Sequence, residues 1–387
     1  MHRISVPERP DWRAKAEQVG FGFHSAEGRP YWDETGAFAF TLREIEENIE
    51  APTAELEEMA LEFVGNACRD EEILTKLAIP GAFWGEIWES WQRGDRNLYG
   101  RFDFAYDGQG PAKLLEYNAD TPTALLETGV FQWLWLEELM ANGQLPAGSD
   151  QFNSLHDKLV AAFANLHNGR KYKLHLACLR DSDEDRGTVG YLEECAQQAG
   201  VATTFLYVDE IGLTKAGKFV DLDNAPIELL FKLYPWEWMM REEFGKSIPG
   251  CGAQFIEPIW KSLLSNKGLL PYLWKMAPGH PNLVPAYFPD ETAADLGNSY
   301  VEKPLFSREG ANIRLFERGR AIGDTEGPYG QEGFIRQQKI VIPDFGSGHV
   351  VLGAWVAASE PAGMLVREDK SPITGNLARF IPHFIEP

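Results

Sequence analysis

The stretch Arg101–Thr123, RFDFAYDGQGPAKLLEYNADTPT, predicts a β-hairpin with an unusually polar face. Its central DGQG sequence has the residues typical of a tight turn between two alternating segments. Side chains alternate along a strand, so residues two apart share a face. Folding about the turn can place Asp103 opposite Glu116 and Arg101 opposite Asn118, all on one face. The hairpin therefore predicts a patch of two carboxylates, one amide and one guanidinium, backed by aromatic residues.

Two carboxylates that face each other repel unless a cation lies between them. Carboxylate and amide oxygens suit a hard divalent cation, above all Mg²⁺. The alternative is an ordinary solvated strand face in which Arg101 neutralises Asp103. The hairpin pattern alone is compatible with both interpretations.

The composition bounds the class of protein. The 387 residues, 44% hydrophobic and 24% charged, predict a globular chain with two or three packed subdomains. A net charge of −22 disfavours nucleic acid and anionic membranes as partners; it serves solubility or attracts a cationic substrate such as an amine. The four scattered cysteines and a start without an apolar leader predict a cytoplasmic protein with reduced thiols. No histidine cluster suggests a zinc site, and no run is long enough for a membrane span.

The first hundred residues predict mainly helices. A capping-box pattern at Thr41–Glu44 predicts a helix that runs to about Arg69 and is interrupted at Pro52. A short hairpin is expected around Asp33–Ala37, before that helix. A tryptophan stripe over Trp84–Trp91 predicts a helix packed on the core.

The middle of the chain predicts a small doubly wound α/β layer. Strands are expected at Leu174–Leu179 and Thr203–Val208, with a helix from near Thr188 to Gly200 between them and another at Ser154–Asn168. Ligands in such layers bind beyond the carboxyl ends of the strands. The acidic loop Asp181–Asp185 would then lie beside a pocket, unless it is an ordinary acidic surface loop.

The last third is rich in predicted strands and carries a cationic loop. Lys303 lies inside the apolar strand Tyr300–Phe306, where a lysine must reach solvent or meet an anion. Arg308 and Gly310 follow in a short loop whose backbone N–H groups could hold phosphate, although a basic hairpin tip is the simpler interpretation. Neither a P-loop nor a strand-linked GxGxxG motif is present. Because Mg²⁺ is often held by carboxylates plus substrate phosphates, this loop complements the acidic hairpin.

The chain resembles the glutathionylspermidine synthase-like proteins, whose synthetase domain belongs to the ATP-grasp ligases. The resemblance extends from ERPDW near the N-terminus to the last strands. Six further motifs occur in the family's order: RFDFAYDG, LLEYNADTPT, FKLYPWEWM, EPIWKSLLSNKGLLP, EKPLFSREGANI and VREDKS.

The resemblance implies a mixed α/β chain with a permuted ATP-grasp fold and a small doubly wound pre-ATP-grasp layer. One synthetase domain would cover residues 1–387. Within it we expect roughly a helical N-terminal region (1–98), a metal-binding hairpin (99–125), a substrate-binding α/β layer (126–250) and an ATP-grasp nucleotide-binding region (251–387).

The resemblance also assigns roles to the hairpin. Asp103 and Glu116 would ligate one Mg²⁺, and Glu116 with Asn118 a second, so that Glu116 would bridge the two ions. Arg101 would stabilise the transition state and, with Asp103, belong to the ATP site.

Further roles follow in the same way for ATP and the substrates. Lys267, which periodicity places in a helix over Lys261–Met276, and Lys303 would contact ATP phosphates. Arg308 would lie in a loop that closes over the reacting phosphate. The remaining implied residues are Glu309, Gly310, Gln338, Lys339 and Ile340 for the nucleotide, and Thr121, Glu184, Asp185 and Arg367 for the substrates.

The sequence departs from the family at several places. An amidase half is not represented, so product hydrolysis is not expected. The segment after Arg367 does not reproduce the acidic residue that holds spermidine, and Leu233 and Trp238 stand where threonines occur. The identities of the peptide and the amine are left open.

The expected function is an ATP- and Mg²⁺-dependent ligase that joins a glutathione-like peptide or amino acid to an amine through an acyl phosphate. Its partners would be small molecules, without nucleic acid or membrane, and it could be a monomer or a homodimer. One alternative is an ATP-binding protein of the same fold without turnover. Another is a carbohydrate-active hydrolase, suggested by 12 tryptophans and paired carboxylates.

Overall fold

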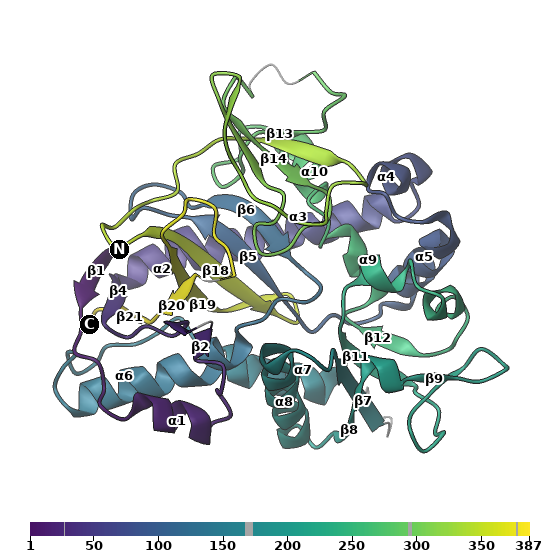
Figure 1. The fold of residues 1–387 in the computed structure, drawn as a ribbon, viewed down its shortest axis with the longest axis horizontal. Helices are drawn as coiled ribbons and strands as arrows, with labels where there is room; N and C mark the ends of the chain where they lie inside the picture. Colours follow the sequence, from purple (N-terminus) through teal and green to yellow (C-terminus); the bar gives the residue numbers. More distant parts are fainter. Residues whose placement is uncertain (27, 167–172, 293–295, 377) are drawn as a thin grey trace.

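The computed structural model describes residues 1–26, 28–166, 173–292, 296–376 and 378–387. Three larger sheets and their helices form the molecule (Figure 1). The central antiparallel sheet has the order β20-β19-β18-β5-β6, and a parallel sheet has the order β12-β11-β7-β8. A second antiparallel sheet, β13-β17-β14-β15-β16, lies at the top of the view in Figure 1. The predicted mixed α/β class is confirmed.

The strands have the following bounds. The central sheet contains β5 (Tyr99–Ala105), β6 (Lys113–Asn118), β18 (His349–Ala357), β19 (Glu360–Asp369) and β20 (Arg379–Ile381). The parallel sheet contains β7 (Lys173–Cys178), β8 (Ala202–Tyr207), β11 (Leu229–Leu233) and β12 (Gln254–Ile256). The upper sheet contains β13 (Ala286–Tyr287), β14 (Tyr300–Pro304), β15 (Arg314–Glu317), β16 (Arg320–Asp324) and β17 (Phe334–Gln338). Smaller sheets contain β1 (His2–Ser5), β4 (Gly36–Phe40) and β21 (His383–Ile385); β2 (Ser25–Ala26) and β3 (Arg29–Pro30); and β9 (Gly212–Leu213) and β10 (Phe219–Val220).

The α-helices are α1 (Trp12–Gln18), α2 (Leu42–Ile45), α3 (Ala51–Ala67), α4 (Glu71–Lys76), α5 (Trp84–Arg93), α6 (Gln132–Ala141), α7 (Leu155–Leu166), α8 (Asp183–Gln198), α9 (Trp236–Met239) and α10 (Leu269–Met276). Two π-helical segments are η1 (Glu46–Glu50) and η3 (Glu127–Phe131). The 3-10 segments are η2 (Gly81–Phe83), η4 (Val208–Glu210), η5 (Phe244–Ser247) and η6 (Ile259–Leu263). No helix in the described ranges is long and apolar enough to cross a membrane.

The predicted hairpin is strands β5 and β6, and its predicted register is confirmed. Asp103 pairs with Glu116, and Arg101 pairs with Asn118. The other edge of β5 pairs with β18, so the hairpin lies within a sheet completed by the end of the chain. Gly353 lies opposite Asp103, and a Cβ atom there would come within 2.7 Å of the Arg101 Cδ atom. A glycine at this position therefore leaves room for the Arg101 side chain.

The opposite face of the hairpin is buried in the core, as its aromatic residues predict. Phe102 and Tyr117 stack with ring centroids 3.8 Å apart. The tryptophan stripe Trp84–Trp91 also packs against this core from α5. Aromatic packing therefore fixes the sheet on one side and leaves the polar residues facing the other way.

The predicted doubly wound layer is present. Strands β7, β8, β11 and β12 are all parallel, and α8 connects β7 to β8. The prediction of an acidic loop at Asp181–Asp185 and a helix beginning near Thr188 is wrong, because α8 already begins at Asp183. The Ser182 side chain accepts the N–H of Asp185, and acidic residues are favourable in a first helical turn. The helix predicted at Ser154–Asn168 is α7, and positions 167–168 lie outside the described residues.

Two predictions for the N-terminal region are corrected. The helix capped at Thr41 is confirmed, but it is not interrupted at Pro52, which lies in the first turn of α3 directly after the π-helical segment η1. The π-helical turn directly before it departs from the regular i→i−4 hydrogen-bond pattern, and this is where a proline without an N–H group is accommodated. The hairpin expected at Asp33–Ala37 is wrong: the hairpin is β2–β3, and Asp33 instead forms a turn by accepting the Thr35 N–H.

The predicted continuous helix over Lys261–Met276 is also wrong. The 3-10 segment η6 ends at Leu263 and α10 begins at Leu269. The Asn266 side chain donates to Leu77 O and accepts the Gly268 N–H, which stabilises a turn between the two segments. Lys267 lies in this turn rather than within a helix.

Candidate functional site

One cavity of about 680 Å³ lies where the three sheets meet. The structure brings every predicted site residue to its wall, although they come from distant parts of the sequence. These residues are Arg101, Asp103, Glu116, Asn118, Thr121, Glu184, Asp185, Lys267, Lys303, Arg308, Glu309, Gly310, Gln338, Lys339, Ile340 and Arg367. Their roles are not tested by this placement and stay predictions.

The polar face of the hairpin forms one wall of the cavity. Arg101 Nε lies 2.7 Å from Asp103 Oδ1, and a second guanidinium nitrogen lies 3.1 Å from Oδ2. Asn118 Nδ2 donates to the same carboxylate at 3.1 Å. Arg101 therefore does neutralise Asp103, but both side chains are buried, so this is not the solvated strand face of the alternative interpretation.

Two lysines, one from the turn before α10 and one from β14, lie near the other carboxylate, that of Glu116. Lys267 Nζ lies 3.1 Å from Glu116 Oε2 and donates to Ser307 O at 2.8 Å. Lys303 Nζ donates to Leu115 O at 2.8 Å. Burial opposes ionisation of Glu116, but Lys267 and Lys303 outweigh it and hold its pKa at about 2. Burial lowers the pKa of Lys303 to about 8 although Glu116 opposes the shift.

The donor set of this wall fits a hard cation. Asp103, Glu116 and Asn118 place two carboxylates and an amide on one face of the sheet, inside a cavity. No group of three or more His, Cys, Asp or Glu side chains in the described ranges could hold a metal alone. A Mg²⁺ ion needs fewer protein ligands when substrate phosphates and water complete its shell. The residues present therefore fit Mg²⁺ bound together with a nucleotide.

The loop after β14 spans the cavity. Arg308 donates to Thr121 Oγ1 and, at 3.0 Å, to Glu237 Oε1. Glu309 and Gly310 both have positive φ angles, and a Cβ atom at Gly310 would lie 2.8 Å from Thr374 O. Glu237 was not among the predicted site residues, although it lies in the motif FKLYPWEWM. The loop is thus tied to the side of the cavity formed by the parallel sheet.

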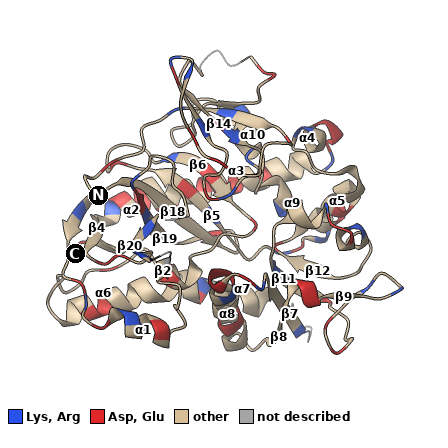
Figure 2. Ribbon diagram, in the orientation of Figure 1, with Lys and Arg blue, Asp and Glu red and all other residues tan. Residues whose placement is uncertain are grey.

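The far end of the cavity is acidic. Glu184 and Asp185 project from the first turn of α8, where burial and the Glu184 charge raise the pKa of Asp185 to about 6. Burial and Glu184 likewise raise the pKa of Glu309. Figure 2 shows acidic residues on α8, below the hairpin strands β5 and β6 in this view, whereas β14, which carries Lys303, lies above them. The cavity is therefore polarised, with cations near Glu116 and carboxylates near α8.

Two residues at the acidic end were missed. Tyr31 lines the cavity, and its hydroxyl donates to the buried Glu127 at 2.7 Å. Tyr31 lies in an irregular aromatic segment without a motif. The sequence does carry a signal for Glu127, because it is a glutamate within an otherwise apolar segment.

The remaining predicted residues lie along the walls. Backbone N–H groups of Gln338 and Lys339 donate to Pro285 O and Ser299 O, and the Lys339 side chain pairs with Glu317. Apolar side chains line the cavity near them: Val301, Leu315, Ile322 and Val341. Arg367 donates to Gly375 O at 2.6 Å. Both Leu233 and Trp238, the departures from the family pattern, also line the cavity.

Comparisons with known proteins cover the whole chain. A family model described as glutathionylspermidine synthase preATP-grasp matches residues 3–386. A putative acid–amine ligase of Haemophilus influenzae is 41% identical, with 100% of both chains covered. The solved structure of a glutathione synthetase-like effector from Globodera pallida has a TM-score of 0.58 at 12% identity, covering 99% of this chain and 100% of that one, which supports a shared fold.

Two larger relatives match over part of their length. Trypanothione synthetase of Crithidia fasciculata is 27% identical over 83% of this chain and 52% of its own. The bifunctional glutathionylspermidine synthetase/amidase of Escherichia coli is 26% identical over 86% of this chain and 56% of its own. The chain thus spans about half the length of these two relatives.

Proposed function

Because the chain belongs to the glutathionylspermidine synthase preATP-grasp family, whose named members are C–N ligases, we propose that it joins a carboxylic acid to an amine at the expense of ATP. ATP would phosphorylate the carboxylate, and the amine would displace phosphate from the resulting acyl phosphate. The acid would be a glutathione-like peptide or an amino acid, in line with the names of the larger relatives.

The observation that carries this proposal is the polarity of the cavity at which the predicted site residues meet. Lys267 and Lys303 lie beside the facing carboxylates at one end, while Glu184 and Asp185 line the other. A nucleotide triphosphate needs cations, whereas an ammonium group needs carboxylates. One cavity with both ends suits a reaction that brings ATP and an amine to the same carboxylate.

The first step depends on charge neutralisation and positioning. Lys267 and Lys303 would bind the phosphates, and Arg101 would stabilise the charge on the transferred phosphoryl group. Asp103, Glu116 and Asn118 would hold Mg²⁺, with Glu116 shared between two ions; bound Mg²⁺ neutralises phosphate charge. Arg308, which is bonded to Thr121 and Glu237 in this structure, would reach the reacting phosphate from another wall of the cavity.

The second step needs the amine next to the acyl group. Glu184 and Asp185 would attract the ammonium form, and the negative charge of the whole chain would raise its local concentration. Thr121 and Arg367 also line the cavity and would orient the acid. Leu233 and Trp238 offer apolar surface there, which suggests a substrate different from that of the spermidine-using relatives.

The test is a screen for ADP release with Mg²⁺ and ATP, using short peptides and amino acids crossed with polyamines and other amines. ADP that appears only with one acid–amine pair, together with an amide product of the summed mass, supports the proposal. No ADP with any pair, while ATP still raises the melting temperature, contradicts it and favours the nucleotide-binding protein without turnover. An Asp103→Asn variant run in parallel separates the reaction from contaminating ATPase.

A further inference from the structure

A pair formed by the half-buried Tyr31 and the buried Glu127 lies at the acidic end of the cavity. Tyr31 lines the cavity, and its hydroxyl donates to Glu127 Oε1 at 2.7 Å. Glu127 is fully buried, and its second oxygen, Oε2, has no hydrogen-bond partner among the described residues. Buried polar atoms are nearly always paired, so an unpaired carboxylate oxygen calls for a functional explanation. The pair connects the cavity to a proton-binding group that solvent does not reach.

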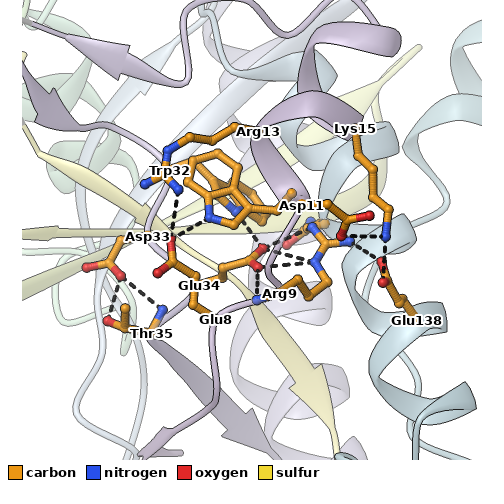
Figure 3. Close-up of polar contacts among 12 residues, drawn as sticks. Glu8, Arg9, Asp11, Arg13, Lys15, Trp32, Asp33, Glu34, Thr35 and Glu138 are labelled. Atoms are coloured by element: carbon orange, nitrogen blue, oxygen red, sulfur yellow. Dashed lines mark hydrogen bonds and ion pairs between the residues drawn. The ribbon is translucent and has the colours of Figure 1, made fainter.

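The segment that carries Tyr31 is held firmly. The Tyr31 N–H donates to His24 O, and the Tyr31 carbonyl accepts the Phe380 N–H at 2.7 Å. The neighbouring residue Trp32 is also held in place, as Figure 3 shows. Trp32 Nε1 donates to Glu34, whose carboxylate forms a buried ion pair with Arg9 at 2.9 Å. The Tyr31 hydroxyl is therefore fixed between the cavity and Glu127.

Charged groups face this pair from several elements. Glu184 on α8 and Arg101 on β5 act on Glu127, and Glu184 and Arg367 on β19 act on Tyr31. Burial, followed by the Glu184 charge, raises the pKa of Glu127 to about 8, while the Tyr31 hydrogen bond and Arg101 oppose the shift. A group that titrates near the working pH is suited to exchange protons with a substrate.

We propose that Tyr31 and Glu127 form a relay that removes a proton from the attacking amine. The inference rests on the proposed ligase function, because it concerns the amine of that reaction. An amine held by Glu184 and Asp185 arrives as an ammonium ion, which has no lone pair and cannot attack. The Tyr31 hydroxyl lies at this end of the cavity and is bonded to a buried carboxylate, that of Glu127.

The step balances as follows. The ammonium group gives one proton to Tyr31 Oη while Tyr31 passes its own proton to the Glu127 carboxylate. The freed amine forms the C–N bond with the acyl carbon, and the bond from that carbon to the phosphate oxygen breaks. The nitrogen gives its second proton to the departing phosphate. Glu127 then returns its proton through Tyr31 to solvent when the products leave.

The test compares two nucleophiles in Tyr31→Phe and Glu127→Gln. The acid is the one that releases ADP in the screen, and the nucleophiles are its protonated amine and hydroxylamine, which is largely unprotonated at neutral pH. Loss of a proton acceptor typically costs about 100-fold or more. We expect a loss of that size with the protonated amine and a far smaller one with hydroxylamine. In the wild type, the rate of the reaction with the amine should rise with pH as Glu127 ionises. This rise should be absent in Glu127→Gln.

Glu57→Gln is the matched control. Glu57 on α3 is also buried and accepts a tyrosine hydroxyl, that of Tyr117, at 2.7 Å, but the pair lies on the core side of the hairpin. This variant should keep the wild-type ratio of rates with the two nucleophiles. A merely structural role for Glu127 would lower both rates together and would overturn the relay.

Failure of the relay and failure of the ligase proposal give different results. If the wild type releases no ADP with any acid–amine pair, both the ligase proposal and the relay are disproved. If the wild type turns over and both variants turn over at the same rate, the relay is disproved and the ligase proposal stands. An infrared titration of the free protein adds a direct check: Glu127→Gln should lose a protonated-carboxyl band that disappears near pH 8 in the wild type. A band that persists in the variant contradicts the assignment.

Discussion

Lys267 Nζ lies 3.1 Å from Glu116 Oε2, and this ion pair joins the turn before α10 to strand β6 of the central sheet. Lys303 from β14 approaches the same strand and donates to Leu115 O, one residue away. The two lysines thus flank the carboxylate proposed as the shared metal ligand. Because their charges outweigh the effect of burial on its pKa, Glu116 is ionised at neutral pH and able to bind a cation.

Glu116→Gln should reduce ADP release by about 100-fold or more, because a group that stabilises transferred charge is typically worth roughly 3–4 kcal/mol. The amide keeps the shape of the side chain but removes the charge that would hold two ions. The far-ultraviolet circular dichroism spectrum should not change. Wild-type ligase activity in this variant would disprove the two-metal assignment.

Glu302→Gln is the control for that experiment. Glu302 is a buried carboxylate on β14 with two cationic partners, Arg314 and Arg336, but it does not line the cavity. It therefore reproduces the loss of a buried, paired charge without touching the proposed site. ADP release by this variant should stay near the wild-type rate.

Lys303→Met should weaken ATP binding about tenfold, which corresponds to about 1.4 kcal/mol. Methionine keeps much of the apolar stem and removes only the charged end, so packing inside β14 is retained. The dissociation constant measured by calorimetry decides the matter, with Lys275→Met as control, since Lys275 pairs with Glu291 outside the cavity. An unchanged dissociation constant would remove Lys303 from the ATP site.

The hairpin was predictable because its determinants are local. The DGQG turn and the alternation of side chains fix the pairing of Asp103 with Glu116, and the structure has that register. The start of α8 was also encoded locally, by Ser182, but the helical periodicity was clearer further along. Because the Ser182 cap was missed, Glu184 and Asp185 were predicted to lie in a loop, whereas they lie in the first turn of α8. The prediction that they lie beside a pocket is confirmed, since both line the cavity.

The missed contacts join residues far apart in the sequence. Tyr31 meets Glu127 across 96 positions, and Lys232 meets Asp120 across 112. Neither pair follows from spacing, because each depends on how segments far apart in the sequence pack. The position of Lys267 was mispredicted for the same reason. Its helical periodicity predicted a helix, but it lies in a turn that Asn266 stabilises by donating to Leu77 O.

Lys232→Met should lower the free energy of unfolding by roughly 3–5 kcal/mol, because it leaves a buried carboxylate without its partner. Lys232 Nζ lies 2.5 Å from Asp120 Oδ1, both side chains are buried, and Asp120 Oδ2 also accepts the Trp236 N–H. Urea unfolding measures the loss. The double variant Lys232→Met/Asp120→Asn should recover part of it, and equal losses in the single and double variants would show that the charge pair is not the cause.

Glu127→Gln should change how stability depends on pH. Burial raises the pKa of Glu127 from 4.5 to about 8 in the folded protein. Above its unfolded pKa, the unfolded chain loses this proton before the folded protein does. The contribution of Glu127 to the free energy of unfolding is therefore fully present at low pH, falls as pH rises toward the folded pKa, and levels off beyond it.

The size of this effect follows from the shift, at about 1.4 kcal/mol for each pKa unit, and amounts to a few kcal/mol. The wild type should therefore lose more stability than Glu127→Gln between about pH 5 and about pH 8 in urea unfolding. Asp185, with its pKa raised to about 6, adds a smaller decline of the same sign to both proteins, so the difference between the two curves isolates Glu127. If the two stability curves are parallel, Glu127 is ionised over the whole pH range in the folded protein. The rate of the amine reaction could then not rise with pH through the ionisation of Glu127.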